Sequence, residues 1–166
     1  MNAPHRVWRL DADVDTDALA PGAWMQHGVD VIAQHCLETL RPDFATGVRP
    51  GDVIVAGPNF GIGSSREQAP AALRHLGLAA VIAPSYSGLF FRNAFNLGLL
   101  LLTCPGCDAI AEGECIAFDA RAGTVTRGGG GGVLRAEPIP AFLLEMVEAG
   151  GLMNQLKRRF GRRTPA

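Results

Sequence analysis

The sequence predicts an α/β fold in which a sheet of mainly parallel strands is covered by helices. Two observations support this prediction. Between residues 53 and 103, short apolar runs alternate with stretches of helical periodicity, in the order strand, helix, strand, helix, strand. The runs are almost wholly apolar and are bounded by glycine or proline turns, as expected of parallel strands buried on both faces.

The individual elements follow in chain order. Residues 7–10 alternate as a short strand, and an acidic turn covers residues 11–17. Apolar residues at helical spacing predict a helix over residues 29–40, which Pro42 stops. The other elements of this region are buried strands at 53–56, 79–83 and 99–103, separated by helices over residues 69–76 and 89–97 that end at Gly77 and Gly98.

The last third of the chain has a different pattern. Short strands are predicted at 115–119, 124–127 and 133–136, and the glycine run 128–132 is interpreted as a hairpin tip because no helix follows it. A helix over residues 140–149 ends at a pair of glycines. The basic tail from residue 157 is interpreted as a solvated, flexible terminus rather than a nucleic-acid arm. We expect one domain over residues 1–166.

Composition limits the class of protein. The chain has 166 residues, of which 48% are hydrophobic and 19% charged, and these values are typical of a soluble globular protein. A formal net charge of −1 gives no reason to expect a nucleic-acid partner. No apolar run is long enough for a membrane span, and no signal-peptide core is found near residue 1, so we expect a cytoplasmic protein.

The cysteines do not predict a metal site. Cys104 and Cys107 have the C-x-x-C spacing of a redox pair or half a metal site. A zinc or iron–sulfur site needs further ligands, and Cys115 is the only nearby candidate. We interpret Cys104 as the buried end of an apolar strand and assign no metal to this chain.

Residues 57–68 form a glycine-rich loop that leads from a buried strand into a helix, where open α/β sheets bind ligands. Its backbone N–H groups favour an anion, and Arg66 adds a charge suited to a carboxylate or phosphate. Ser64 and Glu67 match a helix-capping box, but Pro70 would clash inside a helix that starts at Ser64. We therefore expect an irregular turn over residues 64–68, with the regular helix beginning near Pro70.

The spacing of this loop excludes three common motifs. It lacks the lysine of a Walker A loop, the trailing glycine of a nucleophile elbow and the third glycine of a dinucleotide fingerprint. The residues by themselves indicate an anion-binding turn and leave open whether its serine is reactive.

Residues 59–70 (NFGIGSSREQAP) resemble the signature of the small subunit of 3-isopropylmalate dehydratase, the swivel domain of the aconitase superfamily. Three further segments match that family in the same order: residues 13–17 (DVDTD), 49–55 (RPGDVIV) and 85–98 (SYSGLFFRNAFNLG). The resemblance covers residues 7 to about 104. It implies a swivelling β/β/α three-layer domain, with the short strands of the last third in the second layer.

The resemblance also implies a division of labour between two subunits. A large aconitase-like subunit carries a [4Fe–4S] cluster that binds the substrate, a small dicarboxylate, and this chain closes over it without binding a cofactor. Ser64 matches the base that takes a proton from the carbon next to a carboxylate. Asp17 matches a residue brought near the active site, and whether it takes part directly or only caps a turn is open. The residues that the resemblance implies for substrate binding are Thr16, Gly63, Ser65 and Arg66, with Arg66 as the carboxylate clamp.

Several residues depart from the family pattern. Ile62 and Gln68 replace a cysteine and a histidine, but neither position is the base or the clamp. The residues that match the substrate-selecting loop are Trp24, Met25, Gln26 and His27, in place of the usual Tyr-Leu pair. No arginine follows them, which disfavours a substrate with a third carboxylate. Arg92 and Asn93 are interpreted as structural support for the turn.

The first hypothesis is therefore the small subunit of a heteromeric hydro-lyase acting on a substituted malate, with 3-isopropylmalate, in leucine biosynthesis, as the leading substrate. Related small subunits acting on methylmalate/citraconate, maleate, dimethylmalate or homoaconitate are alternatives within this class. A stand-alone anion- or nucleotide-binding module is an alternative of another class. The third hypothesis is a structural swivel subunit that has lost its catalytic activity.

Overall fold

Parallel strands form the centre of the fold. The computed structural model describes residues 3–161. Within them, the parallel strands lie in the order β4-β3-β2-β1. Their bounds are β1 (His5–Arg9), β2 (Val53–Val55), β3 (Ala80–Ala83) and β4 (Leu101–Thr103). Every residue of β2 and β3 is buried, which explains why both read as continuous apolar runs rather than alternating ones.

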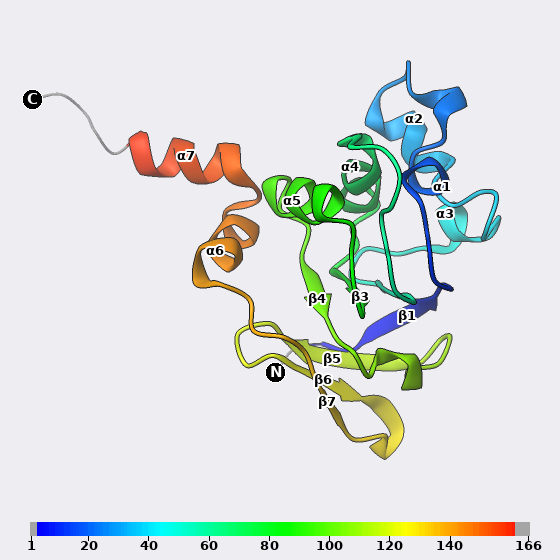
Figure 1. The fold of residues 1–166 in the computed structure, drawn as a ribbon, viewed down its shortest axis with the longest axis vertical. Helices are drawn as coiled ribbons and strands as arrows, with labels where there is room; N and C mark the ends of the chain where they lie inside the picture. Colours follow the sequence, from blue (N-terminus) through cyan, green and yellow to red (C-terminus); the bar gives the residue numbers. More distant parts are fainter. Residues whose placement is uncertain (1–2, 162–166) are drawn as a thin grey trace, which may run out of the picture.

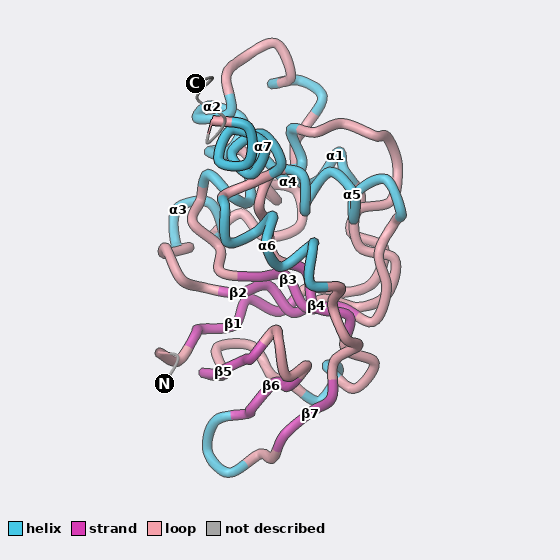
Figure 2. The backbone as a smooth tube through the Cα atoms, turned by 90° about the vertical axis from the view of Figure 1, so that its left-hand side faces the viewer, coloured by secondary structure: helices cyan, strands magenta, loops and turns pink. Residues whose placement is uncertain are grey.

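Helices cover one face of these strands, and an antiparallel group lies on the other (Figures 1 and 2). The helices are α1 (Thr16–Leu19), α2 (Val29–Gln34), α3 (Phe44–Gly47), α4 (Gln68–His75), α5 (Gly88–Asn96), α6 (Ala141–Ala149) and α7 (Leu152–Phe160). The antiparallel strands are β5 (Cys115–Asp119), β6 (Thr124–Arg127) and β7 (Val133–Arg135). This is the predicted three-layer β/β/α arrangement.

The two groups of strands are joined through β1. His5 and Arg6 pair with Ile116 and Cys115 of β5 in antiparallel register, so the hydrogen bonding continues from one group into the other. The second layer is therefore the curled continuation of the same sheet (Figure 2). The glycine run after β6 is the predicted hairpin tip, since β6 pairs directly with β7.

Two predicted boundaries differ from the structure by several residues. The helix predicted over residues 29–40 ends at Gln34, because Leu37 adopts a φ of 61° and its N–H donates to the carbonyl of Ala18 at 2.7 Å. Residues 157–160 of the expected tail belong to helix α7, and residues 162–166 lie outside the described part of the chain. Within residues 3–161, no helix is long and apolar enough to cross a membrane.

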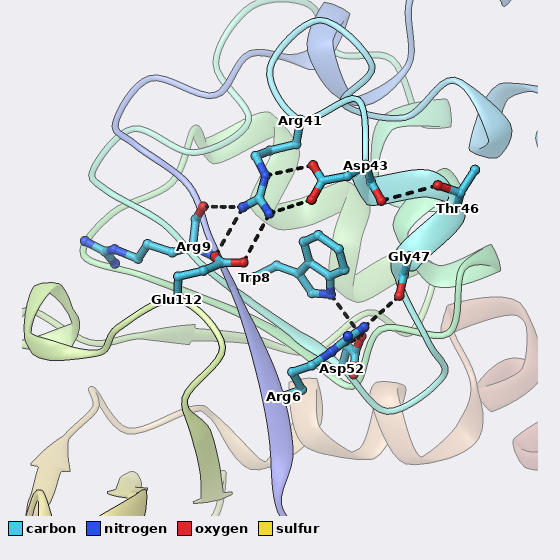
Figure 3. Close-up of polar contacts among 9 residues, drawn as sticks. All are labelled: Arg6, Trp8, Arg9, Arg41, Asp43, Thr46, Gly47, Asp52 and Glu112. Atoms are coloured by element: carbon cyan, nitrogen blue, oxygen red, sulfur yellow. Dashed lines mark hydrogen bonds and ion pairs between the residues drawn. The ribbon is translucent and has the colours of Figure 1, made fainter.

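A polar network around Trp8 ties the parallel strands to the loops before them (Figure 3). The Trp8 ring lies between the guanidinium groups of Arg6 and Arg41, at 5.0 and 4.9 Å from the ring centroid. Its Nε1 donates to Asp52 Oδ2 at 2.9 Å, and Arg6 Nη2 donates to the same oxygen at 2.6 Å. Burial by itself would raise the pKa of Asp52. The hydrogen bonds from Arg6, Trp8 and the Arg49 amide outweigh it and hold that pKa below its ordinary value.

The change Asp52→Asn is expected to lower the free energy of unfolding by about 1–3 kcal/mol at pH 7, because these donors lose a charged acceptor. An Asp whose folded pKa is depressed stabilises the fold fully above its unfolded pKa of about 3.9, and this contribution is lost as the pH falls through the folded value. Urea titrations at pH 7 and pH 3 should therefore show a large difference from the wild type at pH 7 and a smaller one at pH 3. Asp108→Asn, at an exposed residue outside the network, is the control. A difference that does not depend on pH would contradict this account.

Candidate active site

The turn over residues 63–66 is irregular and exposed. Helix α4 begins at Gln68 with Glu67 as its N-cap, and no side chain caps it, so Ser64 does not act as a helix cap. Pro70 lies in the first turn of α4, where its missing N–H costs nothing. Gly63, Ser64 and Ser65 are all exposed. The predicted irregular turn is present over residues 64–66, but the regular helix begins at Gln68, two residues earlier than expected.

The predicted acidic turn lies beside this loop. The Gly61 N–H donates to the carbonyl of Val14 at 2.7 Å, and the Thr16 N–H donates to the carbonyl of Ile62 at 2.8 Å. Asp15, which pairs with Ile62 in this short parallel bridge, caps α1 by accepting from the Ala18 N–H at 2.7 Å. Backbone pairing therefore brings together two segments that are nearly fifty residues apart in the sequence.

Two glycines let the loop pack closely, Gly61 against helix α5 and Gly63 against the acidic turn. Gly61 has a φ of 81°, and a Cβ there would lie 2.2 Å from Cγ of Phe90. Gly63 has a φ of 111°, and a Cβ there would lie 2.9 Å from Oγ1 of Thr16. Both positions therefore require glycine, for the backbone conformation as well as for the space.

The Ser64 hydroxyl lies between two hydrogen-bonding side chains. Arg66 Nε donates to Ser64 Oγ at 2.7 Å. Thr16 Oγ1 accepts from the Ser64 N–H at 3.1 Å and lies 3.3 Å from Ser64 Oγ, so its hydroxyl proton is available to that oxygen. A guanidinium and a hydroxyl aimed at one oxygen stabilise it when it carries negative charge.

Arg66 is itself held in place by the chain after Thr16. Its Nη1 donates to the carbonyl of Ala20 at 2.8 Å and forms a longer ion pair with Asp17 Oδ1 at 3.4 Å. Asp17 Oδ1 also accepts from the Gly22 N–H at 3.0 Å. Nη2 of Arg66 forms no hydrogen bond within the described residues.

Comparison with known proteins places this arrangement in a family. Residues 41–106 match the family model of the aconitase C-terminal domain. The chain is 45% identical over 155 residues to 3-isopropylmalate dehydratase small subunit 1 of Methanopyrus kandleri. This match covers 92% of this chain and 91% of the relative. The chain belongs to the 3-isopropylmalate dehydratase small-subunit family.

Two further comparisons support the assignment and show its breadth. The methanogen homoaconitase small subunit of Methanothermobacter thermautotrophicus is also 45% identical, over 150 residues that cover 90% of this chain and 87% of that one. The crystal structure of 3-isopropylmalate dehydratase from Methanocaldococcus jannaschii superposes with a TM-score of 0.91 at 37% identity and covers 96% of each chain. Since relatives named for different substrates are equally similar, overall identity does not choose among substrates.

The structure places the residues assigned from the resemblance in two groups. Thr16, Asp17, Gly63, Ser64 and Arg66 converge through the contacts described above, and Ser65 lies in the same turn. Asn93 supports this group, because its Nδ2 donates to the carbonyl of Ser65 at 2.8 Å. Arg92 is exposed and forms no hydrogen bond with the described residues.

The second group is the expected substrate-selecting loop of this family, residues 24–27. It begins in the 3-10 helix η1 (Gly22–Trp24), next to the Gly22 amide that binds Asp17. Trp24 and Met25 are half-buried, whereas Gln26 and His27 are exposed. The start of the loop is thus linked to Arg66 through Asp17, which accepts from the Gly22 amide and pairs with Arg66.

Two contacts of this site could not be predicted from the sequence. The Ala20 carbonyl that anchors Arg66 is a backbone group of an ordinary alanine, for which the sequence has no signal. The contact of Thr16 with Ser64 was also missed: Thr16 was assigned to substrate binding from the resemblance, and its side chain is only 2% exposed. A buried threonine beside an exposed serine is a sign of positioning rather than of direct contact with a ligand.

The described cysteines are not arranged as the ligands of an iron–sulfur cluster. Among residues 3–161, no group of three or more His, Cys, Asp or Glu side chains is placed to hold a metal ion. Cys104 and Cys107 are buried, and their thiols contact the carbonyls of Arg135 and Ala56. Burial raises the pKa of Cys107 to about 11, which disfavours the thiolate that a metal requires.

Proposed function

We propose that this chain is the small subunit of a hydro-lyase that dehydrates and rehydrates a substituted malate, with 3-isopropylmalate as the leading substrate. The observation that carries the proposal is the 2.7 Å contact from Arg66 Nε to Ser64 Oγ on an exposed turn. Without such a donor, a serine hydroxyl rarely loses its proton, and so it does not supply the alkoxide that acts as the base. A buried serine would not reach a substrate.

In the proposed reaction, Ser64 Oγ acts as the alkoxide: it takes the proton from the substrate carbon next to a carboxylate and becomes a hydroxyl. The electron pair of that C–H bond forms the double bond, and the hydroxyl group leaves from the neighbouring carbon as hydroxide. Arg66 has two tasks: Nε stabilises the charged serine oxygen, and Nη2 binds the substrate carboxylate. Asp17 holds Arg66 in this position. Its carboxylate competes only weakly with the substrate carboxylate for the guanidinium, because the Asp17 side chain is 70% exposed and the ion pair is long.

The departing hydroxyl needs a Lewis acid, which we place on a large aconitase-like subunit that carries the [4Fe–4S] cluster. Two features of this chain support that division. Its own cysteines do not suit a cluster, and Ser64 lies on the surface, so that another protein must close over the turn to exclude water. We place the assembled enzyme in the cytoplasm, in the leucine branch of amino-acid biosynthesis.

Reconstitution with the large subunit tests the proposal. The assembled enzyme is expected to turn over 3-isopropylmalate. Its turnover of methylmalate, dimethylmalate, maleate and homoaconitate, measured in the same assay, ranks the alternative substrates. A stand-alone anion- or nucleotide-binding module would instead show tight binding of phosphate or nucleotide by the isolated chain in titration calorimetry. That binding, together with no turnover of any diacid by the complex, would overturn the proposal.

The change Thr16→Val tests how Ser64 is positioned. Valine fits the buried site but removes the hydroxyl beside Ser64 Oγ, and losing one hydrogen bond to the reactive oxygen is expected to lower kcat by about tenfold. Thr16→Ser restores the hydroxyl and should restore kcat. Equal activity of the wild type and both variants would show that Thr16 plays no part in catalysis.

A further inference from the structure

Trp24, in the loop expected to select the substrate, contacts two side chains that have no part in the proposed reaction. Its indole ring stacks on the imidazole of His35, with the ring centroids 3.7 Å apart and the planes 6° from parallel. The Trp24 Nε1–H donates to Glu38 Oε1 at 3.4 Å, while Glu38 Oε2 lies 2.7 Å from His35 Nδ1. One carboxylate therefore links both rings. We call His35 and Glu38 the Trp24 bracket.

The backbone that carries the Trp24 bracket is held in place by a buried residue and a long-range hydrogen bond. Leu37, between its two residues, is fully buried and has a φ of 61°, a conformation that a leucine keeps only when its surroundings impose it. The Leu37 N–H donates to the carbonyl of Ala18 in α1 at 2.7 Å. Helix α1 also supplies Thr16 and Asp17 to the active site, so the bracket and the catalytic turn share one support.

The loop itself is attached to the same site at its other end. The Ala20 carbonyl and the Asp17 carboxylate hold Arg66, and Asp17 also holds the Gly22 amide, two residues before Trp24. The position of the Trp24 ring relative to Arg66 therefore depends on η1 on one side and on the bracket on the other. Because Trp24 is only half-buried, packing against the core does not by itself determine where the ring lies.

We propose that His35 and Glu38 are positioning residues that determine substrate selectivity, because they fix Trp24 as a rigid apolar wall against the alkyl substituent of the substituted malate. This inference rests on the proposed function. A rigid wall accepts a substituent of one size and rejects others, whereas a loose ring adapts to several. Loss of the bracket should therefore reduce discrimination between substituents while the proton-transfer machinery stays intact.

The first experiment tests the bracket in the isolated full-length chain. His35→Ala removes the stacked ring, and the intrinsic tryptophan emission is expected to change in intensity and to become more accessible to acrylamide. Trp8, the chain's other tryptophan, is 6% exposed and supplies a constant background. His75→Ala, at the end of α4 and outside the bracket, is the matched control and should leave the emission unchanged. An unchanged spectrum in His35→Ala would overturn the inference.

The second experiment measures selectivity in the complex with the large subunit. Glu38→Ala and His35→Ala are expected to lower the ratio of kcat/KM between the best and the second-best alkylmalate by about tenfold, mainly through KM. Glu38→Gln keeps an acceptor for the indole N–H and should retain more of the selectivity than Glu38→Ala. Glu145→Ala, an exposed residue of α6, is the matched control.

The outcomes separate the two proposals. If the wild-type complex turned over no substituted malate, the proposed function and this inference would fall together. If the wild type were active and selective but His35→Ala and Glu38→Ala kept the same ratio, only this inference would fall. A large fall in kcat for every substrate alike would also overturn it, because it would indicate damage to the catalytic turn rather than a displaced wall.

Discussion

The change Ser64→Ala is expected to lower kcat of the assembled enzyme by about a thousandfold, within the range by which a positioned base accelerates proton transfer. KM should change little, because the hydroxyl acts on the reacting proton in the transition state while Arg66 Nη2 still binds the carboxylate. Steady-state kinetics with 3-isopropylmalate gives both constants. Since Ser64 is exposed, the fold should be unaffected, which thermal unfolding of the isolated chain would verify.

Ser87→Ala is the matched control for this variant. Ser87 precedes α5, and its side chain makes no capping hydrogen bond, so its loss should leave kcat close to the wild-type value. Near-normal turnover by Ser64→Ala would show that another group is the base and would remove the main support of the proposed mechanism.

The change Arg66→Lys is expected to lower kcat/KM by about 10²–10³-fold, comparable to the loss of one preorganised donor in other active sites. From the resemblance alone, the main effect would be on substrate binding, because lysine lacks the guanidinium fork. The structure adds an effect on kcat. A single ammonium cannot contact the Ser64 hydroxyl and the Ala20 carbonyl as Nε and Nη1 do, and still leave a donor placed for the substrate.

Both constants must therefore change in Arg66→Lys, with KM raised and kcat lowered. Arg135→Lys, at an exposed arginine of β7, controls for the chemical change itself and should behave as the wild type does. A variant with raised KM but unchanged kcat would show that the contact from Arg66 to Ser64 is unimportant in the complex.

Much of the fold could be predicted because local signals agreed with the tertiary structure. Strands β2 and β3 are buried on both faces, so every position had to be apolar, and the pattern stood out in the sequence. Helix α5 was recognisable from its periodicity and from Gly98, which follows its C-cap with a φ of 81°. The length of α2 was predicted wrongly, because a hydrogen bond from Leu37 to distant Ala18 ends the helical path.

For the site, the sequence alone determined the composition of the proposed catalytic turn: its glycines, its serine and arginine, and the proline in the first turn of the helix that follows. These properties are local, since they depend on neighbours within about six residues. Only the tertiary structure decided what surrounds the serine. Thr16 reaches Ser64 across 48 positions, and the anchor of Arg66 is a backbone carbonyl that any residue would supply. Backbone pairing and long-range packing leave no pattern in a sequence. These contacts are therefore not predictable from the sequence, and only the tertiary structure shows them.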